Sequence, residues 1–86
     1  MNTFALSVVA IDRIWFQGKA VSCTVRTTTG WRMFEARHEP FLAVLQPSEL
    51  TIVGENGARR SIAIRDGLLR FSGNACVVLV SAGQAS

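Results

Sequence analysis

The chain lacks most of the residue combinations on which enzymes and metalloproteins depend. It has 86 residues, with one histidine and two cysteines, and only 17% of its residues are charged. A single histidine and two cysteines far apart in the sequence do not provide the ligands of an ordinary metal site. His38 is the obvious candidate base, but no Ser-x-Gly elbow, Cys-His pair or glycine-rich phosphate loop accompanies it. The sequence therefore predicts a protein that is not an enzyme and has no cofactor and no metal site.

Long apolar runs are also missing. The longest, ACVVLVSA at 75–82, is far shorter than the roughly 18 to 20 residues of a membrane span and fits a buried strand. The opening residues, MNTFALSVVAIDR, have no basic residue before their apolar stretch, which argues against a secretory signal peptide. Cys23 and Cys76 lie inside apolar patterns, which is typical of buried free thiols in a reducing compartment. We expect an intracellular protein with no transmembrane segment.

Apolar residues, by contrast, are abundant for so short a chain. They make up 49% of the sequence, and the net charge is a mild +3. A chain of this length forms one domain, whose core buries about 60–65% of the surface that the unfolded chain exposes. Residues 1–86 are therefore predicted to form a single domain. The apolar residues exceed what its core requires, so we expect some of them to form a surface for a partner protein.

Apolar and polar residues alternate along short runs throughout the chain, as half-buried β-strands require. Turn residues separate these runs, in GENG at 54–57, DG at 66–67, SGN at 72–74 and TTTG at 27–30. The predicted fold is all-β, a two-sheet antiparallel β-sandwich of about ten short strands. The alternating positions predicted to face its core are Phe4, Leu6, Val8, Val21, Cys23, Val25, Leu50, Ile52, Ile62 and Ile64.

One segment, PFLAVLQ at 40–46, has apolar spacings that suit a helix as well as a strand. A strand is preferred, because the run is short and Pro47 closes it. Three segments are apolar on both faces: RIWF at 13–16, FLAVL at 41–45 and CVVLV at 76–80. An antiparallel strand with one solvated face should alternate, so these outer faces are covered either by the other sheet or by another protein.

Binding of single-stranded nucleic acid by a small β-barrel is the alternative function. Such barrels interleave aromatic and basic side chains, and the residues with this character are Trp31, Arg32, Phe34, Arg37, Arg59 and Arg60. The pattern occurs in one patch only, and an edge strand with Phe34 inward would give the same sequence. We therefore expect no nucleic-acid partner.

Several short motifs follow one another along the chain. FALSVVAIDRIWFQG holds an opening strand, a short second strand and a Phe-x-Gly turn at Phe16 and Gly18. GWRMFEARHEPFLAVLQP has a glycine followed eight residues later by His-x-Pro, then an apolar strand and Pro47. LTIVGENGARRSIAIRDGLLRF contributes Gly57 and Gly67, and NACVVLVSA is a last strand. In this order the motifs resemble the N-terminal β-sandwich domain of the epsilon chain of F-type ATP synthases, without gaps over essentially all of the chain.

The sequence departs from that family's pattern at several positions. Ala36 and Arg37 replace the usual Pro-Gly, Met33 and Ser48 replace glycines, and Asp66 replaces the first of two paired glycines. These departures suggest a divergent or specialised member. The family normally continues beyond the position of Ser86 into a helical hairpin that is associated with inhibiting ATP hydrolysis and, in some members, with binding ATP. Neither role is assigned to these residues.

The resemblance implies a non-catalytic rotor subunit that couples the gamma chain to the membrane-embedded ring of c subunits, at the cytoplasmic face of a bacterial inner membrane. It places Gly30 and Trp31 where the family meets the ring, and His38 near the gamma-facing side. Trp31 is expected to point outward, since Phe34 on the same strand is expected to point inward. The predicted partner interface consists of Gly30, Trp31, Arg32, His38, Phe41 and Trp15.

Overall fold

The structure is a computed structural model that describes residues 2–81 together with 84 and 85. This part of the chain forms strands and turns, and no helix occurs within it. The strands are β1 (Phe4–Val9), β2 (Ile14–Thr27), β3 (Gly30–Glu35), β4 (Phe41–Leu45), β5 (Ser48–Gly54), β6 (Arg59–Ile64), β7 (Asp66–Ser72), β8 (Ala75–Ser81) and β9 (Gln84–Ala85). The segment that could have been a helix is β4, so the preference for a strand is confirmed.

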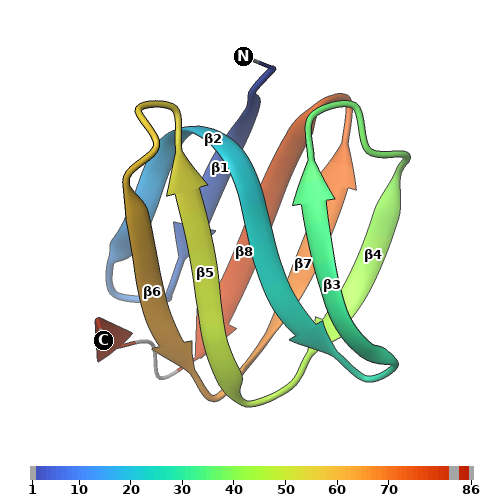
Figure 1. Cartoon of the computed structure of the whole chain (residues 1–86). Helices are drawn as coiled ribbons and strands as arrows, with labels where there is room; N and C mark the ends of the chain where they lie inside the picture. The colour runs from blue at the N-terminus through green and yellow to red at the C-terminus, as the bar shows by residue number, and fades with distance from the viewer. Residues whose placement is uncertain (1, 82–83, 86) are drawn as a thin grey trace.

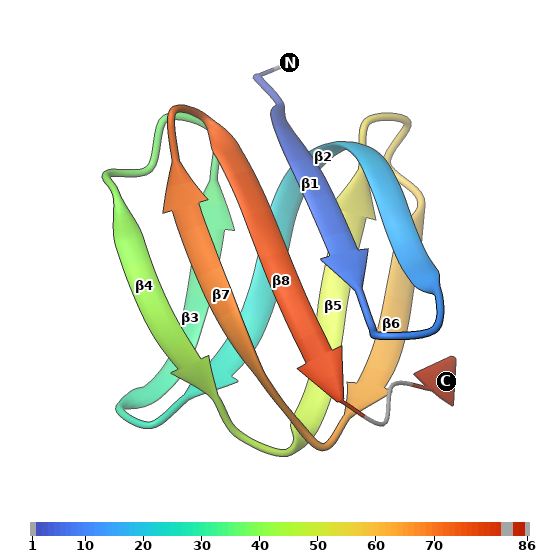
Figure 2. The ribbon, with the colours of Figure 1, turned by 180° about the vertical axis from the view of Figure 1, so that it is seen from behind.

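The strands form two layers that face each other (Figures 1 and 2). One layer contains β1, β8, β7 and β4 in that order, and the other contains β3, β2, β5 and β6, with β9 paired to β6. The predicted β-sandwich is confirmed. One detail differs from a wholly antiparallel arrangement, because β1 and β8 pair in parallel.

Strand β2 belongs to both layers. Its first half pairs with β1 and its second half pairs with β3 and β5. The change of layer falls at Val21, where the β2–β5 register shifts between Ala20 and Ser22. Such a bulge bends a strand and lets it pass from one sheet to the other. Val21 is only half-buried as a result, so its predicted core position is wrong, whereas the other alternating positions predicted to face the core are buried.

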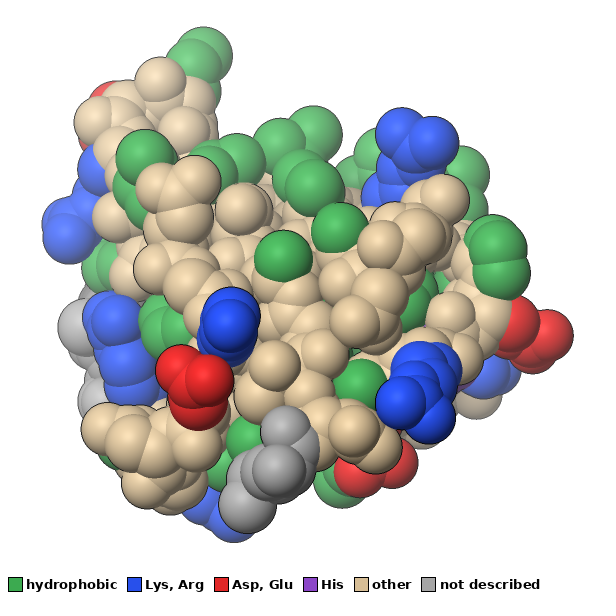
Figure 3. Space-filling view, turned by 90° about the horizontal axis from the view of Figure 1, so that it is seen from above, with side chains coloured by type: hydrophobic (Ala, Val, Ile, Leu, Met, Phe, Trp, Pro, Cys, Tyr) green, Lys and Arg blue, Asp and Glu red, His purple; other side chains and the backbone are tan. Residues whose placement is uncertain are grey.

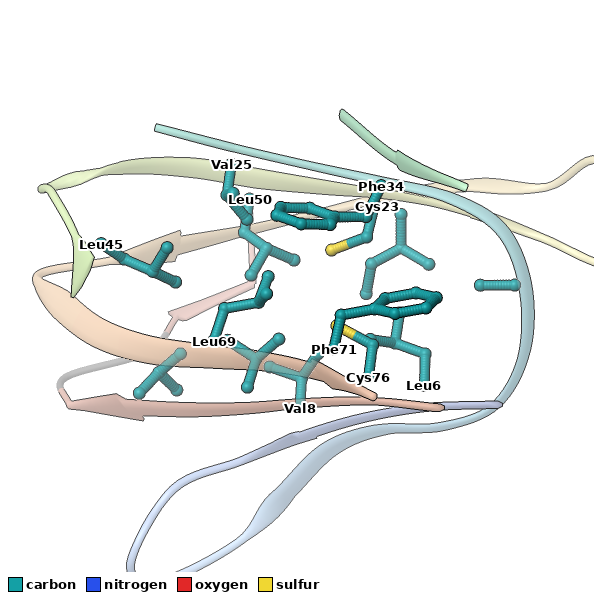
Figure 4. Close-up of a cluster of buried hydrophobic side chains, with 14 of the residues drawn as sticks. Leu6, Val8, Cys23, Val25, Phe34, Leu45, Leu50, Leu69, Phe71 and Cys76 are labelled. Carbon is teal, nitrogen blue, oxygen red and sulfur yellow. The ribbon is translucent and has the colours of Figure 1, made fainter. Parts of the chain in front are cut away.

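The core lies between the layers and is built from aliphatic and phenyl side chains of both (Figure 4). Phe34 comes from one layer and Phe71 from the other, and their rings stack with centroids 6.1 Å apart. Cys23 and Cys76 point into the same space and are buried and unpaired. Burial of Cys76 therefore comes from the sandwich itself and needs no partner.

Most of the predicted turns are found. β7 and β8 are joined by Gly73 and Asn74, which both have positive φ, of 59° and 57°, as a tight hairpin requires. Gly57 has a φ of 85° in the β5–β6 turn. Two expected turns are wrong: Asp66 and Gly67 are the first residues of β7, and Phe16 to Gly18 lie inside β2. In both places the ladder of strand hydrogen bonds continues through the glycine. Glycine is common in turns, but it can also occupy a position inside a strand.

Gly67 is needed for a different reason, because a side chain there would collide with β8. A Cβ atom at Gly67 would lie 2.5 Å from the carbonyl oxygen of Leu79, which is backbone and cannot move aside cheaply. We expect Gly67→Ala to lower the free energy of unfolding by about 1–3 kcal/mol, as overpacking does. Urea denaturation measures this. Gly18→Ala is the matched control, since its Cβ would meet only the Phe16 ring, at 3.8 Å, and an equal loss in both variants would contradict this account.

The two core thiols give a second expectation. Burial raises the pKa of Cys76 to about 12, and burial together with the nearby Cys76 raises that of Cys23 still further. At a pH above the usual thiol pKa of 9.0, the unfolded chain ionises both thiols, whereas the folded chain keeps them protonated. The free energy of unfolding should therefore fall as the pH rises above this value. At neutral pH both should react slowly with a thiol reagent, and urea should accelerate the reaction. Ser72 is exposed, so Ser72→Cys supplies a control thiol, and labelling of Cys23 as fast as this control would show that the Cys23 side chain faces outward.

Candidate interaction surface

The outer face of the β1–β8–β7–β4 layer is covered with aliphatic side chains that the described chain leaves uncovered. The strands alternate, with Ala43, Leu45, Leu69, Val78 and Val80 turned into the core. The intervening side chains point outward, and Leu42 and Leu79 are 65% and 51% exposed. We call this surface the aliphatic face, and it consists of Val9, Leu42, Val44, Leu68, Val77 and Leu79. The other sheet therefore does not cover the outer faces of the two apolar segments at 41–45 and 76–80.

The register of the strands places these side chains in rows. Val44 is opposite Leu68, Leu68 is opposite Leu79, and Leu79 is opposite Val9. Directly opposed residues have Cβ atoms about 4.5–5.5 Å apart, so this row is a continuous aliphatic stripe across the layer. The neighbouring row contains Leu42, Arg70 and Val77. Figure 3, viewed along the strands, shows hydrophobic side chains gathered along the rim of the molecule that this layer forms.

A hollow deepens one end of the aliphatic face. It has a volume of about 610 Å³ and lies between the β1–β2 turn and the floor formed by Val44, Leu68 and Leu79. Ile11 projects from the turn at its side and is fully exposed. Large exposed aliphatic side chains around a concave surface are characteristic of a site that binds another molecule.

The outer face of the other layer has a different character. Its central row joins Thr24, Thr51 and Ser61 across β2, β5 and β6. Hydroxyl side chains can hydrogen-bond to water, and antiparallel sheets commonly have one such solvated face. The large exposed apolar side chains of this layer, Trp31 and Met33, are confined to β3 at its edge, whereas those of the aliphatic face extend across β8, β7 and β4.

Trp31 stands away from the aliphatic face, beside the β2–β3 turn. Thr27 fixes this turn, because its hydroxyl donates to the carbonyl of Gly30 at 2.9 Å and accepts from the amide of Thr29 at 3.2 Å. Gly30 has a φ of 120°, which favours glycine. The β2–β3 register continues without a bulge, so Phe34 is buried and Trp31 is 62% exposed, as alternation predicts.

Arg32 shares the inward side of β3 with Phe34 but lies at the open edge between β3 and β4. Its guanidinium carbon is 4.4 Å from the centre of the Phe41 ring. The charge thus remains at the sheet edge, and the guanidinium covers the Phe41 ring. This arrangement is a cation–π contact. Phe41 is half-buried against the core.

His38 lies in the β3–β4 loop, at the other end of β3 from Trp31 (Figure 1). Its ring is 4.7 Å from that of Phe34 and 5.6 Å from that of Phe71, and its Nδ1 lies 2.7 Å from the carbonyl of Glu39. The loop is held by Asn74, whose Oδ1 accepts from the amide of Arg37 at 2.8 Å. These contacts give His38 a packing role, and none of its described neighbours supplies a nucleophile.

Trp15 lies at the start of β2, where the β1–β2 register skips one residue and turns both Trp15 and Phe16 toward the interior. The guanidinium carbon of Arg13 is 3.8 Å from the centre of the Trp15 ring. Trp15 also lines a second hollow that shares Ala10 and Ile11 with the first. It therefore borders the aliphatic face on the β1 side, as Phe41 borders it on the β4 side.

The residues singled out from the sequence do not form one compact cluster, although Arg32 and Phe41 are in contact. Gly30 and Trp31 mark the β2–β3 turn, with Arg32 beside them. His38 and Phe41 lie at one margin of the aliphatic face and Trp15 lies at another. Of the residues with the aromatic and basic character of a nucleic-acid-binding strand, Phe34 is buried and Arg60 donates to the carbonyl of Trp15.

Sequence reasoning missed individual members of the aliphatic face. Leu68 directly follows the turn predicted at 66–67, and the adjacent Leu68 and Leu69 were the signal of a strand that is apolar on both faces. Val9 and Ile11 were missed because they follow a regularly alternating strand, and only the position of the β1–β2 turn beside β8 brings them to this surface. Among the described residues, no group of three potential metal ligands occurs.

Comparison with known proteins identifies the class of β-sandwich to which this arrangement belongs. Residues 3–85 match the family described as ATP synthase, Delta/Epsilon chain, beta-sandwich domain. The chain is 33% identical over 81 residues to an ATP synthase epsilon chain of Ruminococcus albus, and the match covers 94% of this chain and 60% of that protein. It is 28% identical over 83 residues to an ATP synthase epsilon chain of Clostridium novyi, covering 96% of this chain and 63% of that one.

Solved structures share the fold at lower sequence identity. A chain of the Euglena gracilis mitochondrial ATP synthase (OSCP/F1/c-ring) superimposes with a TM-score of 0.91 at 20% identity, covering 99% of this chain and 54% of that chain. A chain from the central stalk and c-ring of the Tetrahymena thermophila mitochondrial ATP synthase gives a TM-score of 0.75 at 16% identity, covering 92% of this chain and 63% of that chain.

The fold and its exposed surfaces define a small β-sandwich module suited to contact with other proteins. The chain belongs to the ATP synthase delta/epsilon chain β-sandwich family. It spans 60–63% of the length of the two bacterial epsilon chains named above. Within the described residues, no helix is long and apolar enough to cross a membrane.

The exposure of Trp31 yields a direct test of its place in the structure. We expect Trp31→Ala to change the free energy of unfolding by less than about 1 kcal/mol, as at other surface sites. Phe34→Ala on the same strand should cost about 3–5 kcal/mol, because Phe34 fills the core. Urea denaturation of both variants measures the difference, and a large loss for Trp31→Ala would place that side chain in the core.

Proposed function

We propose that the chain is a non-catalytic rotor subunit of an F-type ATP synthase, which couples the gamma chain to the membrane c-ring during proton- or sodium-driven ATP synthesis. Membership of the delta/epsilon family supports this function over nucleic-acid binding. The observation that carries the mechanism is the aliphatic face, which gives a very small domain a surface for stable attachment to another protein. The proposed location is the cytoplasmic face of a bacterial inner membrane, where the chain is held through the complex.

The aliphatic face is proposed as the surface that packs on the gamma chain. Its stripe of Val44, Leu68, Leu79 and Val9 would lose contact with water on docking, and burial of apolar surface contributes about 25 cal/mol per Å². His38, Phe41 and Trp15 border this surface and are proposed to complete its margin.

The β2–β3 turn is proposed as the contact with the c-ring. Gly30 and Trp31 lie at one end of the sandwich, away from the aliphatic face, and Arg32 lies next to them. Tryptophan and arginine are enriched among the interface residues that dominate binding energy. The hydrogen bonds of Thr27 hold the turn in one conformation, so a contact made there transmits a load to the sheet instead of bending the loop.

Two separate contacts predict two separable defects. Leu79→Asp should weaken binding to the gamma chain by at least about tenfold, because it places a charge inside an apolar interface. Trp31→Ala should leave binding to gamma unchanged and weaken the attachment of the gamma-bound chain to the c-ring. Affinity measurements with purified gamma, followed by co-purification with the c-ring, test both parts. Thr51→Asp, on the opposite outer face, is the matched control for Leu79→Asp.

Some results would contradict the proposal. If Leu79→Asp and Thr51→Asp bound gamma equally well, the aliphatic face would not be the docking surface. Loss of gamma binding in Trp31→Ala would show that the two contacts are not separate. Tight, strongly salt-dependent binding of single-stranded oligonucleotides, with no binding to gamma, would support the nucleic-acid alternative.

A further inference from the structure

One charged side chain interrupts the aliphatic face. Arg70 projects outward from β7 and is flanked by Leu42 on β4 and Val77 on β8, the residues directly opposite it. Arg70 is exposed and makes no hydrogen bond or ion pair with another described residue. Its guanidinium therefore has no partner among the described residues, and aliphatic side chains lie on both sides of it in the row.

The outer face of β7 carries two opposite charges. It presents Asp66, Leu68, Arg70 and Ser72 in turn, at every second residue. With a rise of about 3.3 Å per residue, the Cα atoms of Asp66 and Arg70 are about 13 Å apart. The carboxylate of Asp66 accepts a hydrogen bond from the hydroxyl of Ser81, whereas Arg70 has no such partner among the described residues. The charge pattern thus gives the face a direction along β7.

We infer that the segment of the gamma chain that docks on the aliphatic face carries a carboxylate opposite Arg70, together with aliphatic side chains that lie over Leu68 and Leu79. This inference rests on the proposed function. A docked partner would remove Arg70 from water, and burial of an unpaired guanidinium is costly. A carboxylate removes that cost, because it can accept two parallel hydrogen bonds from the planar guanidinium. The pair also fixes the register of docking, which an aliphatic stripe alone does not specify.

Two substitutions of Arg70 separate this pairing from simple packing. Arg70→Leu keeps an aliphatic side chain and removes the charge, so it should weaken binding to the gamma chain by at least about tenfold by leaving the partner's carboxylate buried and unpaired. Arg70→Glu should weaken it further, because two carboxylates would then face each other. Both variants should fold normally, since Arg70 is exposed. Arg59→Leu and Arg59→Glu, on β6 of the other layer, are the matched controls.

The gamma chain supplies the complementary half of the experiment. Each of its acidic residues is replaced by lysine in turn and tested against Arg70→Glu. Recovery of at least about tenfold in affinity with one such variant, and not with the others, identifies the opposing carboxylate by charge exchange. The wild-type affinity should also fall with rising salt more steeply than that of Arg70→Leu.

The possible outcomes distinguish this inference from the proposed function. If Arg70→Leu binds gamma as tightly as the wild type while Leu79→Asp does not, the proposed docking surface is correct, and the inference of a carboxylate opposite Arg70 is wrong. If Leu79→Asp also binds normally, the docking surface itself is wrong, and the inference fails with it. Binding of the chain to anionic phospholipid vesicles through Arg70, without binding to gamma, would overturn both in favour of a lipid surface.

Discussion

The structure depends on the path of β2, which serves both layers of the sandwich. Its first half pairs with β1 and its second half with β3 and β5, and the bulge at Val21 makes the change of layer possible. A pairing with β4 at Thr27 then joins the layers at the far end of the strand. This closure lets so short a chain enclose Phe4, Phe34 and Phe71 completely. A straight β2 would leave two open sheets, each too small to bury its apolar face.

Closure also decides which apolar residues remain outside. Each strand of the β1–β8–β7–β4 layer directs one set of side chains into the core and the alternate set outward. In the other layer the central outward row is polar, with Thr24, Thr51 and Ser61, and the large exposed apolar side chains Trp31 and Met33 lie on β3 at its edge. The difference in stability between exposing threonine and exposing leucine is small for the isolated domain. It becomes large when a partner covers the surface, because only the aliphatic side chains then gain from losing water.

The sequence was sufficient to predict the parts of the structure that depend on local periodicity. Alternation identified the strands containing Phe4, Cys23 and Ile52, and the Gly73–Asn74 turn followed from the ability of both residues to adopt positive φ. The exposed position of Trp31 followed from the buried position of Phe34, because the hairpin has no bulge. The aromatic cluster around His38 could not be predicted, since Phe71 reaches it only through the order of strands in space.

The two wrongly predicted turns have one physical cause. Asp66–Gly67 and Phe16–Gly18 look like turns because glycine is permissive, yet each lies within a strand. At Gly67 the glycine is required by the close approach of the Leu79 carbonyl, which is a tertiary constraint and leaves no local signal. Reassigning Asp66 and Gly67 to β7 turns Leu68 and Arg70 outward, beside β4 and β8. Assigning Gly67 to a turn thus concealed the centre of the aliphatic face. The glycine that lets β7 pack closely on β8 also aligns the row of side chains proposed for docking.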